Sequence, residues 1–544
     1  MQRIKKTVIL LGIFFVLFLT TAYKSDLFEI AKQIEIYTTL FKELNLYYID
    51  DTNPGQLTDT AIKSMLKDLD PYTQFYDEQG VEKARINAAG EFGGIGADVD
   101  IINGKLTVIE PFEKGPADNV GIKAGDEILK INDIEVDKNS LEDALFLLNG
   151  APGSEVILEI DQNGSVTTKS VIRDKVEIDP VPYYHMIDNE VGYIAFIKFN
   201  TKASMQVRQA FEDLKAKGMQ KLILDLRGNP GGLLNEAVEI TNFFIPKDEV
   251  VVTTRAKVKK WSDTYKTKRE PIDLEIPLVV LIDGHSASAA EIVSGSLQDL
   301  DRAVIVGERS FGKGLVQRYR SLTYGTQLKL TISKYYTPSG RNIQELDYTH
   351  RDENGQVPKF SEKKRNAFKT KNGRTVYDGG GIEPDIKLNL TERTEATKAL
   401  FESNAIFNYA TDYYYKHEQT GNPESFIFSD ADYQQFLSAL NNGEVSFKTK
   451  TEIQFENAIE TANTEGYKPQ LMPEYLRLID KAKEEKIQNL QPNKEEIKKR
   501  LSDEIVSRYF YKKGEYIYKV YHDKAILEAV SLINDLGRYQ KVLQ

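Results

Sequence analysis

The chain has 544 residues, of which 41% are apolar, so it is too long for a single hydrophobic core and predicts about three domains. Its net charge of −11 argues against nucleic acid as a partner, because binding to phosphates requires a basic surface. There is no cysteine, which excludes disulfides, thiolate catalysis and cysteine-ligated zinc. The five histidines are scattered without a metal-binding spacing, so neither a metal site nor a cofactor is expected.

The N-terminus combines a basic end with an apolar run. Three basic residues precede an uninterrupted apolar stretch that ends at Ala22 and is slightly shorter than the roughly 20 residues of a bilayer span. This order predicts a secretory signal peptide or a single membrane anchor over residues 1–22. We therefore expect the remaining chain in the cell envelope, either in the periplasm or anchored to the inner membrane and facing outward. The sequence leaves open whether the segment is removed, and hence whether the protein associates with the membrane.

Residues 23–87 have a helical pattern. The stretches LFEIAKQIEIYTTLFKELN and LTDTAIKSMLKDL repeat apolar residues three and four positions apart, as one face of a helix requires. The following LDPYTQFYD is a turn-forming segment with aromatic residues. We predict an N-terminal helical region here.

Residues 88–173 alternate mainly between strands and turns. The stretch VIEPFEKGPADNVGIKAGDEILKINDIEV predicts a strand, a short helix ending at Gly121, and a turn at Gly125–Asp126 into a further strand. It resembles a PDZ domain of the permuted bacterial kind, and another small β-rich module is the alternative. The resemblance implies that an extended C-terminal peptide binds as an added strand while backbone N–H groups hold its carboxylate. The loop that would hold the carboxylate comprises Gly94, Ile95, Gly96 and Ala97.

Residues 174–392 alternate between strands and helices. Buried strands such as KLILDLR and PLVVLI are followed by loops and helices, which predicts a parallel or mixed sheet covered by helices. Functional groups in such folds gather in loops at the carboxyl ends of the strands, here at Gly228–Gly232 and Gly284–Ser288. A polar insertion at about residues 345–379 is expected to form a surface loop. Residues 393–544 carry amphipathic helical patterns and predict a separate helical domain, to which the sequence assigns no chemistry.

Two serines lie in the loop DGHSASAAE, between a buried strand and a helix. Ser288 stands where the helix begins, so unpaired N–H groups of the first helical turn would face whatever its hydroxyl attacks. Such donors are what an oxyanion needs, whereas Ser286 lies earlier in the loop and lacks them. The alternative role of Ser288 is that of a helix N-cap, the commonest role of a serine at this position.

A nucleophilic serine needs a base, and the sequence offers a histidine and a lysine. His285 precedes Ser288 across a tight turn without a carboxylate–histidine pattern, so it is disfavoured. Lys313 is flanked by two glycines in FGKGLVQ, which predicts a lysine held close against backbone. In a strand, Lys313 and Gln317 share one face, so that Gln317 could hold the ammonium group. The base requires a pKa about three units below the ordinary 10.4 of lysine, hence a dry site without a carboxylate partner such as Glu308.

The stretches LDPYTQFYD, LDLRGNPGG, SASAAEI, FGKGLVQ and YYTPSGRNIQ … GGIEPDI follow one another in the chain, with the PDZ-like segment after the first. Together, over about residues 40–390, they resemble the carboxyl-terminal processing peptidases, also called tail-specific proteases. The resemblance implies a multidomain α/β protein with a crotonase-like protease core, an inserted PDZ domain, an N-terminal helical segment and a C-terminal helical domain. It implies Ser288 as nucleophile, Lys313 as general base and Gln317 as the residue that positions the lysine. The implied oxyanion hole consists of backbone N–H groups of Ala289, Gly231 and Gly232.

Two features depart from the family pattern. An insertion separates Gln344 from Gly380, where the family often runs almost directly from one motif to the next. Asn149 stands in LLNGAPG, near the end of the second PDZ helix, where many members carry a basic residue. A detailed gating mechanism of relatives is therefore not transferred to this chain.

The leading hypothesis is an exported serine endopeptidase that recognises protein or peptide substrates by a free, apolar C-terminus and cleaves them with a serine–lysine dyad. A catalytically silent PDZ scaffold of the cell envelope is the alternative, which the intact Ser288, Lys313 and Gln317 disfavour. A crotonase-like acyl-CoA enzyme is disfavoured by the PDZ segment and the export segment, since acyl-CoA is cytoplasmic. No nucleic-acid partner is expected, and the sequence leaves self-association open.

Overall fold

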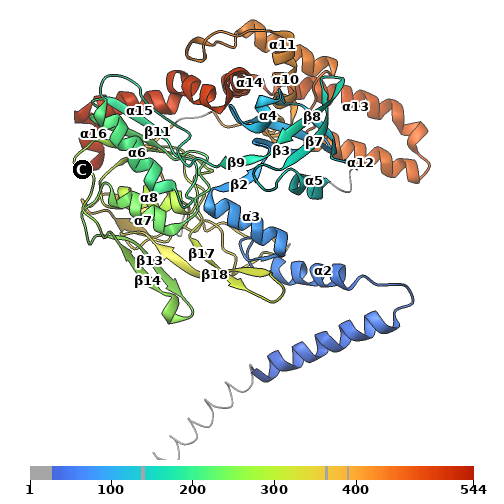
Figure 1. Cartoon of the computed structure of the whole chain (residues 1–544), viewed down its shortest axis with the longest axis horizontal. Coiled ribbons are helices and arrows are strands. Elements are labelled where there is room, and N and C mark those ends of the chain that lie inside the picture. The colour runs from blue at the N-terminus through green and yellow to red at the C-terminus, as the bar shows by residue number, and fades with distance from the viewer. Residues whose placement is uncertain (1–26, 137–140, 354, 362–364, 389–390) are drawn as a thin grey trace, which may run out of the picture. The chain divides into compact units, whose positions relative to one another are not determined.

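The computed structural model describes residues 27–136, 141–353, 355–361, 365–388 and 391–544. The chain forms two compact units, a smaller one that ends at Asp77 and also includes Tyr319–Leu330, and a larger one made of Glu78–Arg318 and Thr331–Gln544 (Figure 1). The predicted signal peptide or anchor at residues 1–22 lies outside the described residues. Within the described part of the chain, no helix is both long and apolar enough to cross a membrane.

The smaller unit is mainly helical, as the sequence predicts. Residues 27–47 form one helix, and α2 (Pro54–Lys67) forms the next. The side chain of Asn53 caps α2 by accepting a hydrogen bond of 3.1 Å from a backbone N–H of the first turn, and a proline begins the helix. β1 (Gln74–Tyr76) then pairs antiparallel with residues 327–329.

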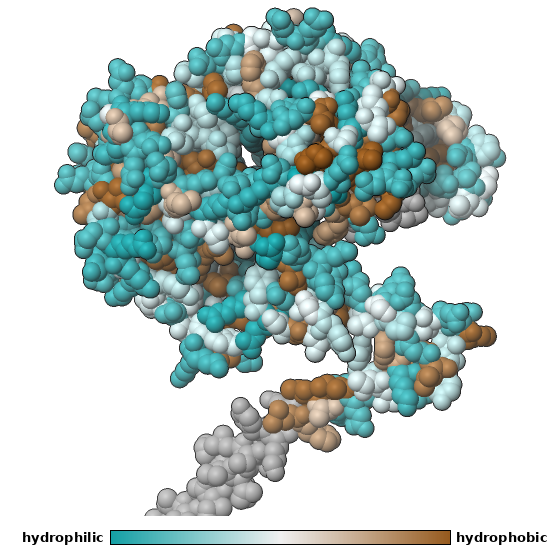
Figure 2. Space-filling view, in the orientation of Figure 1, coloured by the Kyte–Doolittle hydropathy of each residue, from teal (hydrophilic) through white to brown (hydrophobic). Residues whose placement is uncertain are grey.

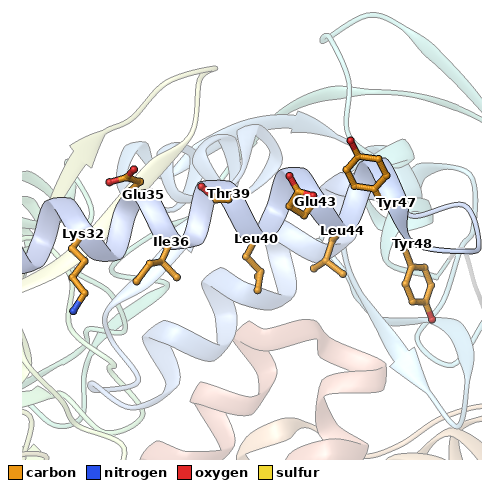
Figure 3. A pocket seen from close by; sticks show the side chains of 9 residues that line it. All are labelled: Lys32, Glu35, Ile36, Thr39, Leu40, Glu43, Leu44, Tyr47 and Tyr48. Atoms are coloured by element: carbon orange, nitrogen blue, oxygen red, sulfur yellow. The ribbon is translucent and has the colours of Figure 1, made fainter.

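The helix at residues 27–47 keeps many apolar side chains on its surface. Figure 2 shows brown, apolar groups along this part of the chain, and Figure 3 shows Ile36, Leu40, Leu44 and Tyr48 directed to one side of the helix. With other residues between Lys32 and Tyr47 they line a shallow hollow of about 770 Å³. Because residues 32–48 alone line it, the hollow is part of an exposed apolar face and not an enclosed site.

The PDZ segment of the larger unit forms a six-stranded antiparallel sheet. Its strands are β3 (Ala97–Ile102), β4 (Lys105–Pro111), β5 (Glu127–Ile131), β6 (Ile134–Glu135), β7 (Glu155–Gln162) and β8 (Ser165–Ile172). The order β3-β4-β5-β7-β8, with β6 beside β5, places β3 at an edge of the sheet. Two short helices accompany it, α4 (Pro116–Asn119) and α5 (Leu141–Leu147), and α5 contacts β3 and β4. The predicted stop at Gly121 is confirmed, because its φ of 79° is a conformation that glycine adopts readily.

Two strands that pair with each other flank the PDZ segment in the sequence. β2 (Glu91–Gly94) and β9 (Asp174–Glu177) pair antiparallel, one before and one after the PDZ sheet, and α3 (Glu78–Ala89) precedes β2. The PDZ-like sheet is therefore inserted into the larger unit, in agreement with the predicted architecture.

A six-stranded sheet forms the centre of the larger unit. Its strands, in spatial order, are β10 (Tyr183–Met186), β11 (Val191–Ala195), β12 (Lys221–Asp225), β15 (Leu278–Ile282), β16 (Val304–Gly307) and β21 (Ile386–Lys387). All neighbours are parallel except β10 and β11. Three helices, α6 (Ala203–Ala216), α7 (Leu234–Asn242) and α8 (Ala289–Asp299), pack on one face. The central strands are continuous apolar runs because both faces are covered.

The second face of this sheet is covered by the C-terminal end of the chain. α15 (Lys524–Asn534) and α16 (Leu536–Leu543) bury residues such as Ile526 and Leu532 against alternate side chains of β11, β12, β15 and β16 (Figure 1). The sequence predicts residues 393–544 as one separate helical domain, whereas in the structure its last two helices pack on the core sheet. Amphipathic spacing identifies the apolar face of a helix but not the surface on which it packs.

The preceding part of this segment is helical, as predicted, and has its own apolar core. Its elements are α9 (Glu395–Glu402), α10 (Ala405–Lys416), η3 (Pro423–Ser425), α11 (Asp430–Asn442), α12 (Lys450–Thr464), α13 (Lys468–Gln488), η4 (Gln491–Asn493) and α14 (Lys494–His522). Phe436, Leu501 and Ile505 are fully buried in this core. α14 is kinked at Phe510 and Tyr511, where the φ of Tyr511 is 55°. The long helix therefore changes direction before it leads into α15.

A second, antiparallel sheet contains β13 (Val250–Ala256), β14 (Asp263–Lys266), β17 (Leu315–Ser321) and β18 (Gln327–Tyr336), with η1 (Lys259–Trp261) between the first two. Within the predicted insertion, β19 (Ala367–Lys369) and β20 (Thr375–Tyr377) form a hairpin. Arg374 of this hairpin forms ion pairs of 2.6 Å with Asp301 and 2.5 Å with Asp385. Part of the insertion is therefore anchored on the core and is not a free surface loop.

Candidate active site

Ser288 lies in the turn between β15 and α8. Its φ of 56° and ψ of −110° form a conformation that residues other than glycine rarely adopt. Ser288 is half-buried, whereas α8 is buried along its whole length. The turn places the serine at the N-terminal end of the helix, beside the N–H groups of the first turn, as the sequence predicts. Its role as nucleophile stays a prediction.

The neighbouring Ser286 and His285 have different surroundings. Ser286 is fully buried, and its hydroxyl lies 2.8 Å from the Leu226 carbonyl oxygen and 3.2 Å from Asp283 Oδ1. This hydroxyl is committed to holding the loop. His285 is exposed, and its backbone N–H donates to Asp283 Oδ1 at 3.0 Å. The engaged Ser286 hydroxyl agrees with the preference for Ser288, which stays a prediction.

A buried glutamate, which the sequence did not single out, connects the serine with the lysine. Glu291 Oε2 accepts hydrogen bonds from the N–H groups of Ser288 at 2.8 Å and Lys313 at 2.9 Å. Its Oε1 accepts from the Ser310 hydroxyl at 2.6 Å and from the Gly312 N–H at 2.7 Å. Burial raises the pKa of Glu291, whereas these four donors favour its ionised form. One carboxylate thus joins the backbones of the two predicted catalytic residues.

Besides Glu291, the side chains of Asn342 and Gln344 hold the loop that carries Lys313. The Gly314 N–H donates to Gln344 Oε1 at 2.9 Å, and Asn342 Nδ2 donates to the Gly314 carbonyl at 3.3 Å. A Cβ at Gly314 would lie 2.8 Å from both Asn342 Nδ2 and the Gln344 backbone nitrogen, and one at Gly312 would lie 2.6 Å from a neighbouring Cβ. Larger residues are therefore excluded at both positions. The predicted close approach of backbone around the half-buried Lys313 is confirmed.

Gln317 lies in β17, and the lysine lies just before that strand. Gln317 Nε2 donates a hydrogen bond of 3.1 Å to Thr331 Oγ1 on the neighbouring β18. This bond orients the carboxamide and assigns its nitrogen as the donor to the threonine. Its oxygen is the group that would accept from an ammonium, so the predicted positioning of Lys313 by Gln317 stays a prediction.

The glycine turn after β12 lies directly against Ser288. A Cβ on Gly231 would lie 2.8 Å from the Ala289 nitrogen and 2.9 Å from Ser288 Cβ, so the two loops are in contact. The Gly231 N–H donates to Asn229 Oδ1 at 2.9 Å, and the Asn229 carbonyl accepts from Ala287 N–H at 2.9 Å. The predicted Gly231 donor is therefore already engaged in this structure. Of the predicted oxyanion donors, Ala289 and the exposed Gly232 remain.

A second carboxylate binds the serine loop to the glycine turn. Asp283 Oδ1 accepts from the N–H groups of Gly228, His285 and Ser286, each at 3.0 Å. Gly228 begins the glycine turn, and the other two residues belong to the serine loop. Like Glu291, Asp283 accepts mainly from backbone N–H groups, so both acids are suited to fix loop geometry.

The predicted carboxylate-binding loop of the PDZ domain lies between β2 and the edge strand β3. The carbonyls of Ile95 and Gly96 accept hydrogen bonds from Ala117 N–H at 2.8 Å and Phe112 N–H at 2.9 Å. These bonds turn the carbonyls into the domain and fix the peptide planes of the loop. Gly96 has a φ of 69°, and a Cβ there would lie 2.6 Å from a proline ring carbon. The free edge of β3 beside α5 is the position that strand addition requires.

Among the described residues, no group of three or more histidine, aspartate or glutamate side chains is arranged to hold a metal ion. The acids near the site instead support the backbone. The sequence contained a usable indication of Glu291, because serine followed three residues later by glutamate at a helix start is the capping-box pattern. It contained no comparable indication of the clamp by Asn342 and Gln344, since those contacts depend on tertiary structure.

Comparison with known proteins agrees with this arrangement. A model of peptidase family S41 matches residues 190–350, a PDZ domain model matches residues 108–162, and a model of the probable PDZ-protease C-terminal helical domain matches residues 396–533. A carboxy-terminal-processing protease of Bartonella bacilliformis is 35% identical over 324 residues, which cover 58% of this chain and 74% of that protein. The carboxy-terminal processing protease CtpA of Bacillus subtilis is 32% identical over 305 residues, which cover 56% of this chain and 65% of that protein.

Among solved structures, a photosystem II D1 C-terminal processing protease is similar to this chain. The two share 27% sequence identity with a TM-score of 0.37, over 64% of this chain and 86% of that one.

Proposed function

We propose that this chain, which belongs to peptidase family S41 and is a serine-type peptidase with a PDZ domain, cleaves protein substrates that it recognises by their free C-terminus. Ser288 is the proposed nucleophile and Lys313 the proposed general base. The observation that carries this assignment is the bonding of Glu291 Oε2 to the backbone N–H groups of both residues. The backbones of this serine and this lysine are held by one buried acceptor, both residues are half-buried, and the serine lies against a glycine turn. These are the surroundings that a serine–lysine dyad requires.

The reaction would begin with attack of Ser288 Oγ on the scissile carbonyl carbon, while its proton passes to Lys313 Nζ. The oxygen of the tetrahedral intermediate would accept hydrogen bonds from the N–H groups of Ala289 and Gly232. The lysine would then return the proton to the leaving amine, and water would hydrolyse the acyl-enzyme by the same sequence of transfers. Lys313 has to be neutral at the start, so the site has to lower its pKa, and Gln317 would hold its amine in place.

The PDZ domain supplies the proposed specificity. A substrate tail would lie along the free edge of β3, with its terminal carboxylate at the N–H groups of Gly94, Ile95, Gly96 and Ala97. Apolar side chains in the last positions would face the half-buried apolar residues that border this edge, such as Val99 and Leu145. Recognition would thus depend on the charged end of the substrate and on the apolar character of its final residues.

Matched peptides with free and amidated C-termini test both parts of the proposal. Charge-assisted hydrogen bonds contribute roughly 1.5–3 kcal/mol, so amidation is expected to reduce kcat/KM by about ten- to a hundredfold. Ser288→Ala is expected to abolish cleavage of both peptides, whereas Ser286→Ala retains much of it. Equal rates for the two peptides would contradict tail recognition, and an active Ser288→Ala variant would contradict the dyad.

We also propose that the protein acts in the cell envelope. The support is the sequence of residues 1–22, with its basic end and apolar run. Fractionation of cells that produce the full chain tests this location. Accumulation in the cytoplasmic fraction would contradict it, and recovery in the periplasmic or membrane fraction is the expected result.

A further inference from the structure

An arginine at the base of the glycine turn is shared between two carboxylates from distant parts of the chain. Arg227 follows β12 and directs its guanidinium to Asp225, with Nη2 2.6 Å from Oδ2 and Nε 2.9 Å from Oδ1. Its Nη1 donates to Asp523 Oδ1 at 2.8 Å. All three guanidinium nitrogens are therefore engaged, two of them toward Asp225 and the third toward Asp523.

Asp523 stands at the junction of α14 and α15, in the segment to which the sequence assigned no chemistry. It caps α15, because its Oδ1 accepts from the N–H groups of Ala525 at 2.9 Å and Ile526 at 3.2 Å. Its side chain is only 6% exposed, and Oδ2 lies 3.4 Å from Lys499 Nζ. Burial opposes its charge, but the charges of Arg227 and Lys499 hold the pKa of Asp523 well below its usual range. Asp523 is thus ionised throughout the neutral range.

The arginine is connected to the turn that faces Ser288. Its own backbone N–H donates to Asp225 Oδ1 at 3.0 Å, so both ends of the residue are fixed to the end of β12. The next residue, Gly228, donates to Asp283, which also holds the serine loop. The turn then reaches Gly231, where an added Cβ would lie 2.9 Å from Ser288 Cβ. Any change in the direction of Arg227 would therefore be passed to the proposed oxyanion donors.

We infer that Asp523 is a positioning residue of the active site, which acts through Arg227 on the glycine turn at residues 228–232. The inference rests on the proposed function, because the turn has a catalytic role only if Ser288 is the nucleophile. It assigns a task to the C-terminal helical segment beyond covering the core sheet. Asp523, which bonds to Arg227, lies between α14 and α15. The geometry of the turn therefore depends on how these two helices pack against the core.

The test compares Asp523→Asn with Asp535→Asn in the full chain. Asparagine caps helices as well as aspartate does, so both variants keep an N-cap, and only the first removes a charge from Arg227. Asp535 is the matched control, because it caps α16 by accepting from Arg538 N–H at 3.0 Å and is exposed. We expect Asp523→Asn to lower kcat by about tenfold, whereas a 1 Å misplacement of a reacting group costs roughly a hundredfold. KM and the binding of C-terminal peptides are expected to stay unchanged. Asp535→Asn is expected to keep the wild-type kcat.

The same kcat for both variants would overturn the inference. If Asp523→Asn lowers the folded fraction, Arg227→Lys decides, because lysine keeps the charge but cannot bridge two carboxylates with a fork. A folded Arg227→Lys variant with wild-type kcat would overturn the inference, and a lower kcat at constant KM would support it. Ser288→Ala, measured in parallel, separates the two proposals: if it is active, the proposed function fails whatever Asp523 does.

Discussion

Replacement of Glu291 by glutamine is the sharpest test of how the site is held together. Both oxygens of this buried carboxylate accept hydrogen bonds, two from the serine–lysine pair of backbones and two from Ser310 and Gly312. A glutamine has the same shape but only one oxygen. In Glu291→Gln, the amide nitrogen would therefore face two donor groups from which it cannot accept a hydrogen bond.

The size of the effect follows from the number of bonds lost. A hydrogen bond to a charged group contributes about 1.5–3 kcal/mol, so the loss of two lowers the free energy of unfolding by about 3–6 kcal/mol if the loops cannot rearrange. Rearrangement would relieve this loss by moving the Ser288 and Lys313 backbones apart. A displacement of about 1 Å at a reacting group costs roughly a hundredfold in rate, which is the fall in kcat that we expect.

The assay measures kcat and KM on a peptide with a free C-terminus, together with thermal unfolding of each variant. Glu236→Gln is the matched control, since Glu236 also lies in the first turn of a helix but accepts a single N–H, from Ser204 at 2.7 Å. The control is expected to retain its activity. A folded Glu291→Gln variant with a kcat near that of the wild type would show that this carboxylate does not set the geometry of the dyad.

Three further results are expected. Both Lys313→Ala and Lys313→Arg are inactive, because arginine keeps the charge but does not release a proton near neutral pH; a fully active arginine variant would contradict the role as base. Chelators leave the rate unchanged, and a chelator-sensitive activity restored by zinc would contradict this. Burial raises the pKa of Glu110 to about 7, so the folded state favours the protonated acid. The free energy of unfolding therefore falls by up to about 3 kcal/mol as pH rises from about 4.5 to about 7. Glu110→Gln removes this dependence, which denaturant titrations across that range would reveal.

The sequence predicted the elements that local pattern determines. The helix end near Gly121, the strands of the core and the tight packing around FGKG could all be predicted, because nearby residues indicate turns, buried strands and glycine positions. The residues that contact those elements could not be predicted. Gln344 and Asn342 clamp Gly314 from a different segment, and only the folded chain brings them together.

In the glycine turn, the structure reduces the number of oxyanion donors that the family resemblance implied. The resemblance implied both Gly231 and Gly232 as oxyanion donors, but the Gly231 N–H bonds to Asn229 Oδ1. An asparagine side chain that accepts from a backbone N–H two residues later is a local motif, so its presence just before Pro-Gly-Gly could have raised the question from sequence. The structure keeps Gly232, which is exposed, as the candidate donor from this turn.

Lys313, the proposed base, has a buried acid, Glu291, close to its backbone. A carboxylate bonded to the ammonium of Lys313 would raise its pKa and disable it, whereas Glu291 is bonded to the backbone N–H of that residue. Four donors spread over both oxygens satisfy the carboxylate, so it has no oxygen left without a hydrogen-bond donor. Asp283 accepts from backbone N–H groups through Oδ1, and Asp523 accepts from backbone N–H groups and from Arg227. Acids can thus fix the loops of such a site because each is already bonded to donors other than the amine that has to accept the proton.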